Sequence, residues 1–171
     1  MFMGESGVGK STLFNILMGF LHEYEGEVKI NDVEHRLFNL TALRRQIGIA
    51  FQSANVISVG LDDNIQLGED LPKLADIIEI TNLSAVKSSK TEADLHGQAL
   101  SGGEKSRIGL AQTLIRSPEV ILIDETFSSL DEAMEEEILG KLFEKYPSKT
   151  VICISHRAAS KKYFDKVVQF G

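Results

Sequence analysis

A glycine-rich stretch near the start of the chain has the residue types needed to hold a phosphate group. Residues 4–12 read GESGVGKST, with a strand-like run before them and a helix-like run after them. The glycines let the backbone curl, so that successive N–H groups face one concavity at the positive end of the helix. Lysine reaches the β- and γ-phosphates, and serine binds Mg²⁺. The pattern predicts phosphate binding by Gly4, Glu5, Ser6, Gly7, Val8, Gly9, Lys10, Ser11 and Thr12.

Two acidic residues follow another apolar run. Val120–Ile123 ends in Asp124 and Glu125. If this run is a strand parallel to the one before the glycine-rich loop, Asp124 lies where it can hold a Mg²⁺ ion. Strand alternation directs Glu125 to the opposite side, where it is placed to polarise an attacking water as a general base. Acids also end strands for purely structural reasons, but the neighbouring phosphate loop favours the functional interpretation.

A second glycine motif, Leu100–Glu104, precedes a helix with apolar helical spacing. Ser101 and Glu104 have the spacing of a capping box, which is a structural device. Two glycines in the first turn weaken a helix, however, and they leave backbone N–H groups uncovered at its positive end. This motif therefore predicts a second anion site. Since one nucleotide has one γ-phosphate, already held by the first loop, we expect the second site to serve a nucleotide carried by another subunit.

These motifs resemble those of ATP-binding-cassette (ABC) ATPases. Residues 4–12 are similar to the Walker A loop, Leu100–Glu104 to the signature, and Val120–Glu125 to Walker B with its catalytic glutamate. Three further matches are Gln52 to the Q-loop glutamine, Ser128–Asp131 to the D-loop, and His156 to the switch histidine. All six occur in family order across nearly the whole chain.

The resemblance implies where ATP and Mg²⁺ bind. Mg-ATP would lie between residues 4–12 of one domain and the signature of a second domain, paired head to tail with the first. The metal would contact Ser11, Gln52 and Asp124, partly through water. Residues expected to contact the partner's nucleotide are Ser101, Gly102, Gly103 and Asp131.

The resemblance also implies the reaction, which is ATP hydrolysis. Glu125 would activate the water, Gln52 would contact Mg²⁺ and that water, and His156 would contact the γ-phosphate. The expected partners are a second nucleotide-binding domain, identical or different, and transmembrane domains that are fused to the chain or form a separate subunit. Hydrolysis would then power transport of a substrate that the sequence does not identify.

The elements that must position these residues follow from the hydrophobic pattern. Apolar runs of strand length alternate with helix-period segments, which predicts an α/β fold: a P-loop NTPase core with a mostly parallel sheet. The expected strands are residues 1–3, 47–51, 120–123 and 150–154, and Val28–Ile30 with Asn31-Asp32 is typical of a hairpin. We expect one domain, with a core of residues 1–60 and 98–171 and a small α-helical subdomain at about 61–97. Within this subdomain, the serine-rich Ser84–Lys90 is expected to be a loop.

The chain also departs from the family pattern. Only Met1–Met3 precede Gly4, so we expect the N-terminal antiparallel β-subdomain, with its adenine-stacking aromatic residue, to be largely missing. Other segments resemble those of exporters rather than importers: Leu43–Arg45, Asp63–Ile65 and Thr91–Gly97.

Composition excludes several classes of protein. A net charge of −7 over 171 residues argues against a nucleic-acid partner. No apolar stretch reaches bilayer-spanning length, and Cys153 lies alone in an apolar run, so we expect a soluble chain at the cytoplasmic face of a membrane. The acidic run at residues 131–137 is expected to be a solvated helix start. The alternative functions to a transport ATPase are a nucleotide-binding regulatory module without turnover, a DNA-repair or chromosome ATPase, and a small-molecule kinase.

Overall fold

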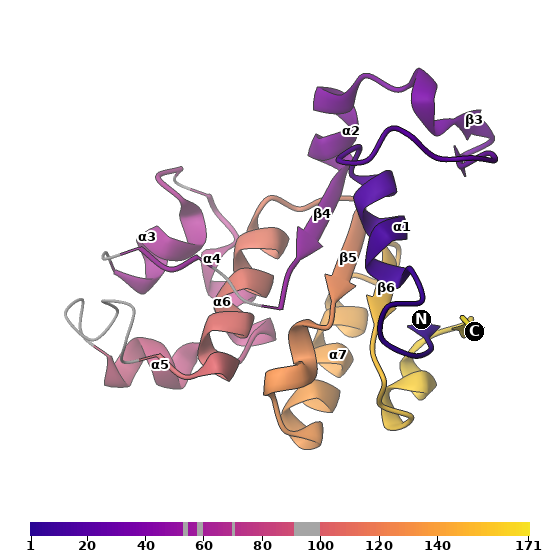
Figure 1. The fold of residues 1–171 in the computed structure, drawn as a ribbon. Helices are drawn as coiled ribbons and strands as arrows, with labels where there is room; N and C mark the ends of the chain where they lie inside the picture. The colour runs from indigo at the N-terminus through magenta and orange to yellow at the C-terminus, as the bar shows by residue number, and fades with distance from the viewer. Residues whose placement is uncertain (53–54, 58–59, 70, 91–99) are drawn as a thin grey trace.

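A five-stranded parallel sheet forms the centre of the protein (Figure 1). The computed structural model describes residues 1–171 except 53–54, 58–59, 70 and 91–99. The strands follow the order β4-β5-β6-β1-β7 and pair in parallel throughout. Their bounds are Phe2–Met3 for β1, Ile47–Ala50 for β4, Val120–Asp124 for β5, Thr150–Ile154 for β6 and Val168–Gln169 for β7. The predicted α/β fold with a parallel sheet is confirmed.

Helices cover both faces of the sheet. Ile121 and Ile123 of β5 pack in one hydrophobic cluster with residues of α6 (Gly102–Ile115) and α7 (Glu132–Lys145). The intervening Leu122 belongs to a second cluster, formed with residues of α1 (Lys10–Leu17) and α2 (Leu40–Gln46). Because alternate side chains are buried on opposite faces, the strand reads as a continuous apolar run. Cys153 of β6 is buried.

The predicted hairpin is present as a two-stranded antiparallel sheet. β2 (Lys29–Ile30) pairs with β3 (Val33–Glu34), and a short 3₁₀ helix, η1 (His35–Leu37), follows. Asn31 and Asp32 have φ angles of 49° and 64°, respectively. Positive φ at both central positions is characteristic of the turn that joins strands with the ordinary right-handed twist.

Three short helices lie beside α6 (Figure 1): α3 (Leu61–Gln66), α4 (Leu74–Ile80) and α5 (Ser84–Ser89). The prediction of a loop over Ser84–Lys90 is wrong. The hydroxyls of Ser88 and Ser89 donate to carbonyls one turn earlier, including that of Ala85, so the polar side chains are satisfied inside the helix. Val86 on the other face is buried. The exporter-like Thr91–Gly97 lies outside the described residues.

The acidic start of α7 is only partly solvated, so this prediction is wrong for Glu135. Asp131 caps the helix by accepting from the backbone N–H of Met134 at 2.8 Å. Glu135 is fully buried, because α7 packs against η4 (Ala159–Tyr163) and the carboxylate meets Arg157 and Ser160 there. In the sequence, Glu135 lies one helical turn after the cap, and none of its neighbours indicates that a distant segment buries it.

Candidate functional site

The glycine-rich loop joins β1 to α1 and closes around its lysine. Gly7 and Gly9 have φ angles of 85° and 101°, in the region that favours glycine, and Gly9 is the N-cap of α1. Lys10 is only 4% exposed, and its ammonium donates to the carbonyls of Gly4 at 2.8 Å and Glu5 at 2.7 Å. The loop therefore holds a buried cation beside the N-terminus of a helix, and both features attract an anion.

A cavity of about 540 Å³ opens beside this loop. Its lining comes from three separate parts of the chain and consists of Ser6, Gly7, Gly9, Lys10, Ser11, Thr12, Phe51, Gln52, Asp124 and Glu125. Most of the residues predicted to bind phosphate and metal are thus brought to one place. Gly4 and Glu5 lie outside the lining, although their carbonyls accept from Lys10, and Val8 also lies outside it with its side chain exposed.

Two of the predicted metal ligands are in direct contact. The Ser11 hydroxyl donates to Asp124 Oδ1 at 2.9 Å, where β5 ends beside α1. Burial raises the pKa of the Asp124 carboxyl above its ordinary value, and the hydrogen bond from Ser11 offsets part of that effect. A half-buried carboxylate and a hydroxyl fit Mg²⁺, which takes one or two carboxylates and completes its shell with water and phosphate oxygens. Among the described residues no group of three or more His, Cys, Asp or Glu could hold a metal by itself.

The raised pKa of Asp124 predicts a pH effect on stability. The folded chain keeps this proton to higher pH than the unfolded chain, so stability falls as pH rises from the ordinary Asp value, about 3.9, through the folded pKa. Without Mg²⁺ and nucleotide, we expect Asp124→Asn to unfold at a higher temperature than the parent near neutral pH, because no charge is buried. The difference should shrink in acid.

Thermal unfolding followed across pH measures this effect, with the exposed Asp165→Asn as the control. A parent that is more stable than Asp124→Asn at neutral pH would contradict the assignment of burial as the dominant influence on this carboxyl.

Glu125 leaves the strand and faces a histidine. Its φ of 49° places it in the left-handed region at the start of η3 (Thr126–Ser129), so the predicted strand alternation does not hold at this position. Asp124 and Glu125 line the same cavity but have different partners. Glu125 Oε1 lies 3.3 Å from His156 Nε2, and both residues line an adjoining cavity of about 180 Å³. Backbone strain of this kind is concentrated at functional sites.

Gln52 forms hydrogen bonds to α6, the helix that begins within the signature motif, and to η3. Its side-chain amide donates to Ser128 Oγ at 3.0 Å, and its backbone carbonyl accepts from Ser106 Oγ at 2.7 Å. Ser106, fully buried on α6, also lies 2.8 Å from Ser129 Oγ. Sequence reasoning did not single out Ser106. The sequence signal that could have identified Ser106 is its position among the apolar residues of a helix that packs on the sheet. A hydroxyl buried there needs a hydrogen-bond partner.

The signature motif lies outside the phosphate cavity of its own chain. Ser101 caps α6 by accepting from Glu104 N at 3.2 Å, and Glu104 Oε2 accepts from Ser101 N at 2.7 Å, so the capping box is formed. Packing explains the glycine at position 103, because a Cβ there would lie 2.8 Å from Leu130 Cδ2 and that side chain would have to shift. Gly102 has room for one. In the described part of the chain, neither the three residues from Ser101 to Gly103 nor Asp131 line that cavity.

The profile of the family described as ABC transporter matches residues 1–128 of the 171. The chain belongs to the ABC transporter family. This ABC chain is 34% identical over 97% of its length to a putative export ATP-binding/permease protein of Rickettsia felis. It is 33% identical over 99% to the ABC-type transporter atr1 of Mycosarcoma maydis. It is 30% identical over 97% to the heterocyst differentiation ATP-binding protein HepA of a Nostoc species.

A solved structure extends the likeness of this ABC chain to the whole fold. A bacterial Atm1-family ABC exporter with ATP bound matches 99% of the chain with a TM-score of 0.88 and 28% identity. The chain spans 31% of that structure's length and between 13% and 30% of the lengths of the three curated relatives. Within the described ranges, no helix is long and apolar enough to cross a membrane.

Proposed function

We propose that this ABC-family chain binds and hydrolyses Mg-ATP in a site completed by a second nucleotide-binding domain, identical or different. One observation carries the proposal: the phosphate loop and Gln52, Asp124 and Glu125 line one cavity, whereas the signature glycines lie outside it. A chain with two phosphate-directed motifs that do not meet needs a partner to bring them together. Head-to-tail pairing achieves this for both copies.

Within this site, each side chain has a task that fits its contacts. Lys10 and the loop N–H groups bind the phosphates, and Ser11, Asp124 and Gln52 would hold Mg²⁺. The bound metal would neutralise charge on the β- and γ-phosphate oxygens. Glu125 accepts a proton from the attacking water. His156, in contact with Glu125, is placed to donate to the γ-phosphate.

The partner's nucleotide would meet the other end of the domain. α6 is 14 residues long, and Ser101, Gly102 and Gly103 form its N-terminus, where backbone N–H groups and the helix dipole favour an anion. Asp131 follows directly after the segment that packs on Gly103. We infer that these four residues contact ATP bound by the other domain.

The names of the relatives extend the proposal to the whole protein. Because one relative is named an export ATP-binding/permease protein and a structural neighbour is titled an exporter, we infer that hydrolysis powers export across a membrane. Transmembrane domains, fused to the chain or in a separate subunit, are then its second partner, and the chain works at the cytoplasmic face. In this scheme residues 1–60 and 98–171 form the ATPase core, and 61–97 form the helical subdomain.

ATP turnover measured against protein concentration tests the shared site. Per-chain turnover is expected to rise about tenfold for each tenfold increase in concentration while most chains are monomers, and then to level off. A per-chain rate that is constant across the range would contradict the shared site. Nucleotide binding with no hydrolysis at any concentration would contradict the proposed reaction and favour a binding-only module.

A further inference from the structure

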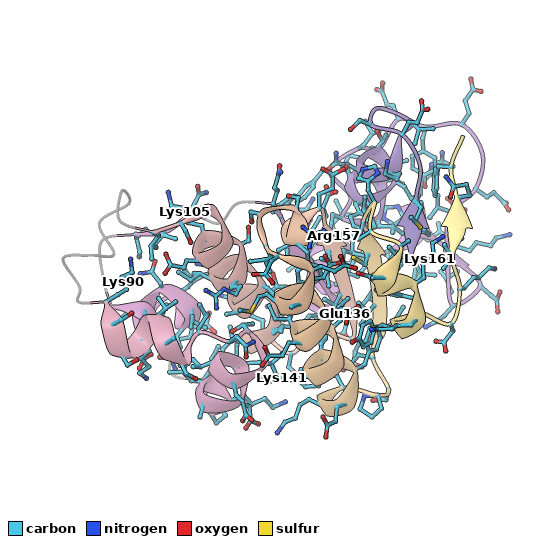
Figure 2. All side chains as sticks on the ribbon, turned by 90° about the horizontal axis from the view of Figure 1, so that it is seen from below. Lys90, Lys105, Glu136, Lys141, Arg157 and Lys161 are labelled. Atoms are coloured by element: carbon cyan, nitrogen blue, oxygen red, sulfur yellow. The ribbon has the colours of Figure 1, made fainter. Side chains whose placement is uncertain are left out.

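We propose that Arg157 is a positioning residue, which uses its ion pair with a buried glutamate to fix the switch histidine against the segment that faces the partner domain. The proposal rests on the proposed ATP hydrolysis. Arg157 follows His156 directly, at the end of β6, and no motif identified in the sequence includes it. Figure 2 shows it at the N-terminal end of α7, with Glu136 and Lys141 further along that helix.

The guanidinium of Arg157 joins two elements. One nitrogen donates to Glu135 Oε2 at 2.8 Å, and the other donates to the backbone carbonyl of Leu130. The second carboxylate oxygen of Glu135 accepts from Ser160 Oγ at 2.6 Å. Glu135 has no exposed surface, so the arginine balances its charge inside the protein and the serine satisfies its second oxygen.

These contacts link the residue after His156 to the residue before Asp131. On one side, Arg157 directly follows His156, and its backbone N–H donates to Ser155 Oγ at 3.2 Å. On the other side, Leu130 immediately precedes Asp131, the cap of α7 and a proposed contact of the partner's nucleotide. One side chain therefore fixes the histidine that acts on the chain's own nucleotide relative to the loop that faces the other nucleotide.

Stability alone does not explain this pair. Replacing a buried ion pair by apolar residues of similar volume is often neutral or stabilising, whereas removal of one partner is strongly destabilising. A pair kept only for folding could therefore be exchanged for two apolar side chains without loss of activity. A pair that orients Leu130 and His156 could not, because the apolar replacement has no donor for the Leu130 carbonyl.

The test uses the full chain with the double substitution Glu135→Leu/Arg157→Met. Its matched control is Glu136→Leu/Lys162→Met, which removes an ion pair of 2.8 Å between α7 and η4 at a more exposed position. Four quantities are measured: the unfolding midpoint, the binding of a non-hydrolysable ATP analogue, ATP turnover, and hydrogen exchange of the amides at 128–131 and 155–157.

The expected result separates turnover from folding. The Glu135→Leu/Arg157→Met chain should unfold within about 4 °C of the parent and bind the analogue equally well. Its turnover should fall at least about tenfold, and its amides at 128–131 and 155–157 should exchange faster. The control should match the parent in all four quantities. Parental turnover and exchange in the double variant would overturn the proposal.

A second variant covers the case in which the double substitution does not fold. Arg157→Lys keeps the charge beside Glu135 but cannot present two nitrogens in a fixed fork. We expect it to keep parental nucleotide binding and to lose turnover, with faster exchange at 128–131. Parental turnover in Arg157→Lys would overturn the proposal. Hydrogen exchange keeps the test separate from the proposed function, because a parent without ATP turnover contradicts hydrolysis but leaves the predicted change in exchange measurable.

Discussion

Replacing Glu125 by glutamine is expected to lower ATP turnover by about 10²–10⁴-fold, the range that a positioned general base supplies. The amide has the shape of the carboxylate but cannot accept a proton from water. Glu125 lines the phosphate cavity, and its side chain lies 3.3 Å from His156 Nε2. Nucleotide binding by the glycine-rich loop should therefore persist, and the loss should appear in kcat and not in the affinity for ATP.

Steady-state hydrolysis and analogue binding, measured on the same preparation, check this expectation. Glu132→Gln is the matched control, because Glu132 is an exposed glutamate on α7. Parental turnover in Glu125→Gln would remove Glu125 from the chemistry. A parallel loss of analogue binding would instead assign Glu125 to nucleotide binding.

Gly102→Asp is expected to lower turnover at least about a hundredfold, because like charges in close contact repel strongly where water is excluded. Gly102 is the first residue of α6, and among the described residues a side chain there meets only Ser129 Cβ, at an ordinary distance of 3.5 Å. An acid is also favoured in the first turn of a helix, so the fold should tolerate the change. The new carboxylate would occupy the N–H groups proposed for the partner's γ-phosphate.

The control for this substitution is Gly102→Ala, which adds the same Cβ without charge and should keep most of the turnover. Dilute Gly102→Asp chains should still bind an ATP analogue as the parent does, since Gly102 does not line the phosphate cavity. Equal losses in Gly102→Ala and Gly102→Asp would indicate a packing defect. Weakened analogue binding by dilute Gly102→Asp would show that Gly102 acts within its own chain.

Much of the site could be predicted from the sequence because its parts are local. Residues 4–12 are contiguous, and their order fixes both the loop and the helix that follows. The parallel sheet followed from apolar runs such as Val120–Ile123, because strands covered on both faces carry no polar alternation. That Asp124 lies near the phosphate loop also followed, since parallel strands of one sheet end at the same edge of it.

What the sequence did not predict depends on contacts between distant segments. Glu135 looks like any acid near a helix start, and only the packing of the segment after β6 against α7 brings Arg157 to it. Strand alternation predicted that the Glu125 side chain points away from that of Asp124, but the strand has ended at this residue, whose backbone is in the left-handed region. The helix α5 is another case, because the hydrogen bonds that satisfy its serines appear only once the backbone is helical.

The shared ATP site is tested most directly by mixing two inactive chains. Lys10→Met lacks the cation of its phosphate loop, and Gly102→Asp lacks a working signature, so neither chain should hydrolyse ATP alone. In a mixed head-to-tail dimer, one site combines an intact loop with an intact signature. With random pairing in a 1:1 mixture, turnover should recover to about a quarter of the parental value, because half of the dimers are mixed and each has one good site of two. A mixture as inactive as its two components, at concentrations where the parent is fully active, would contradict the shared site.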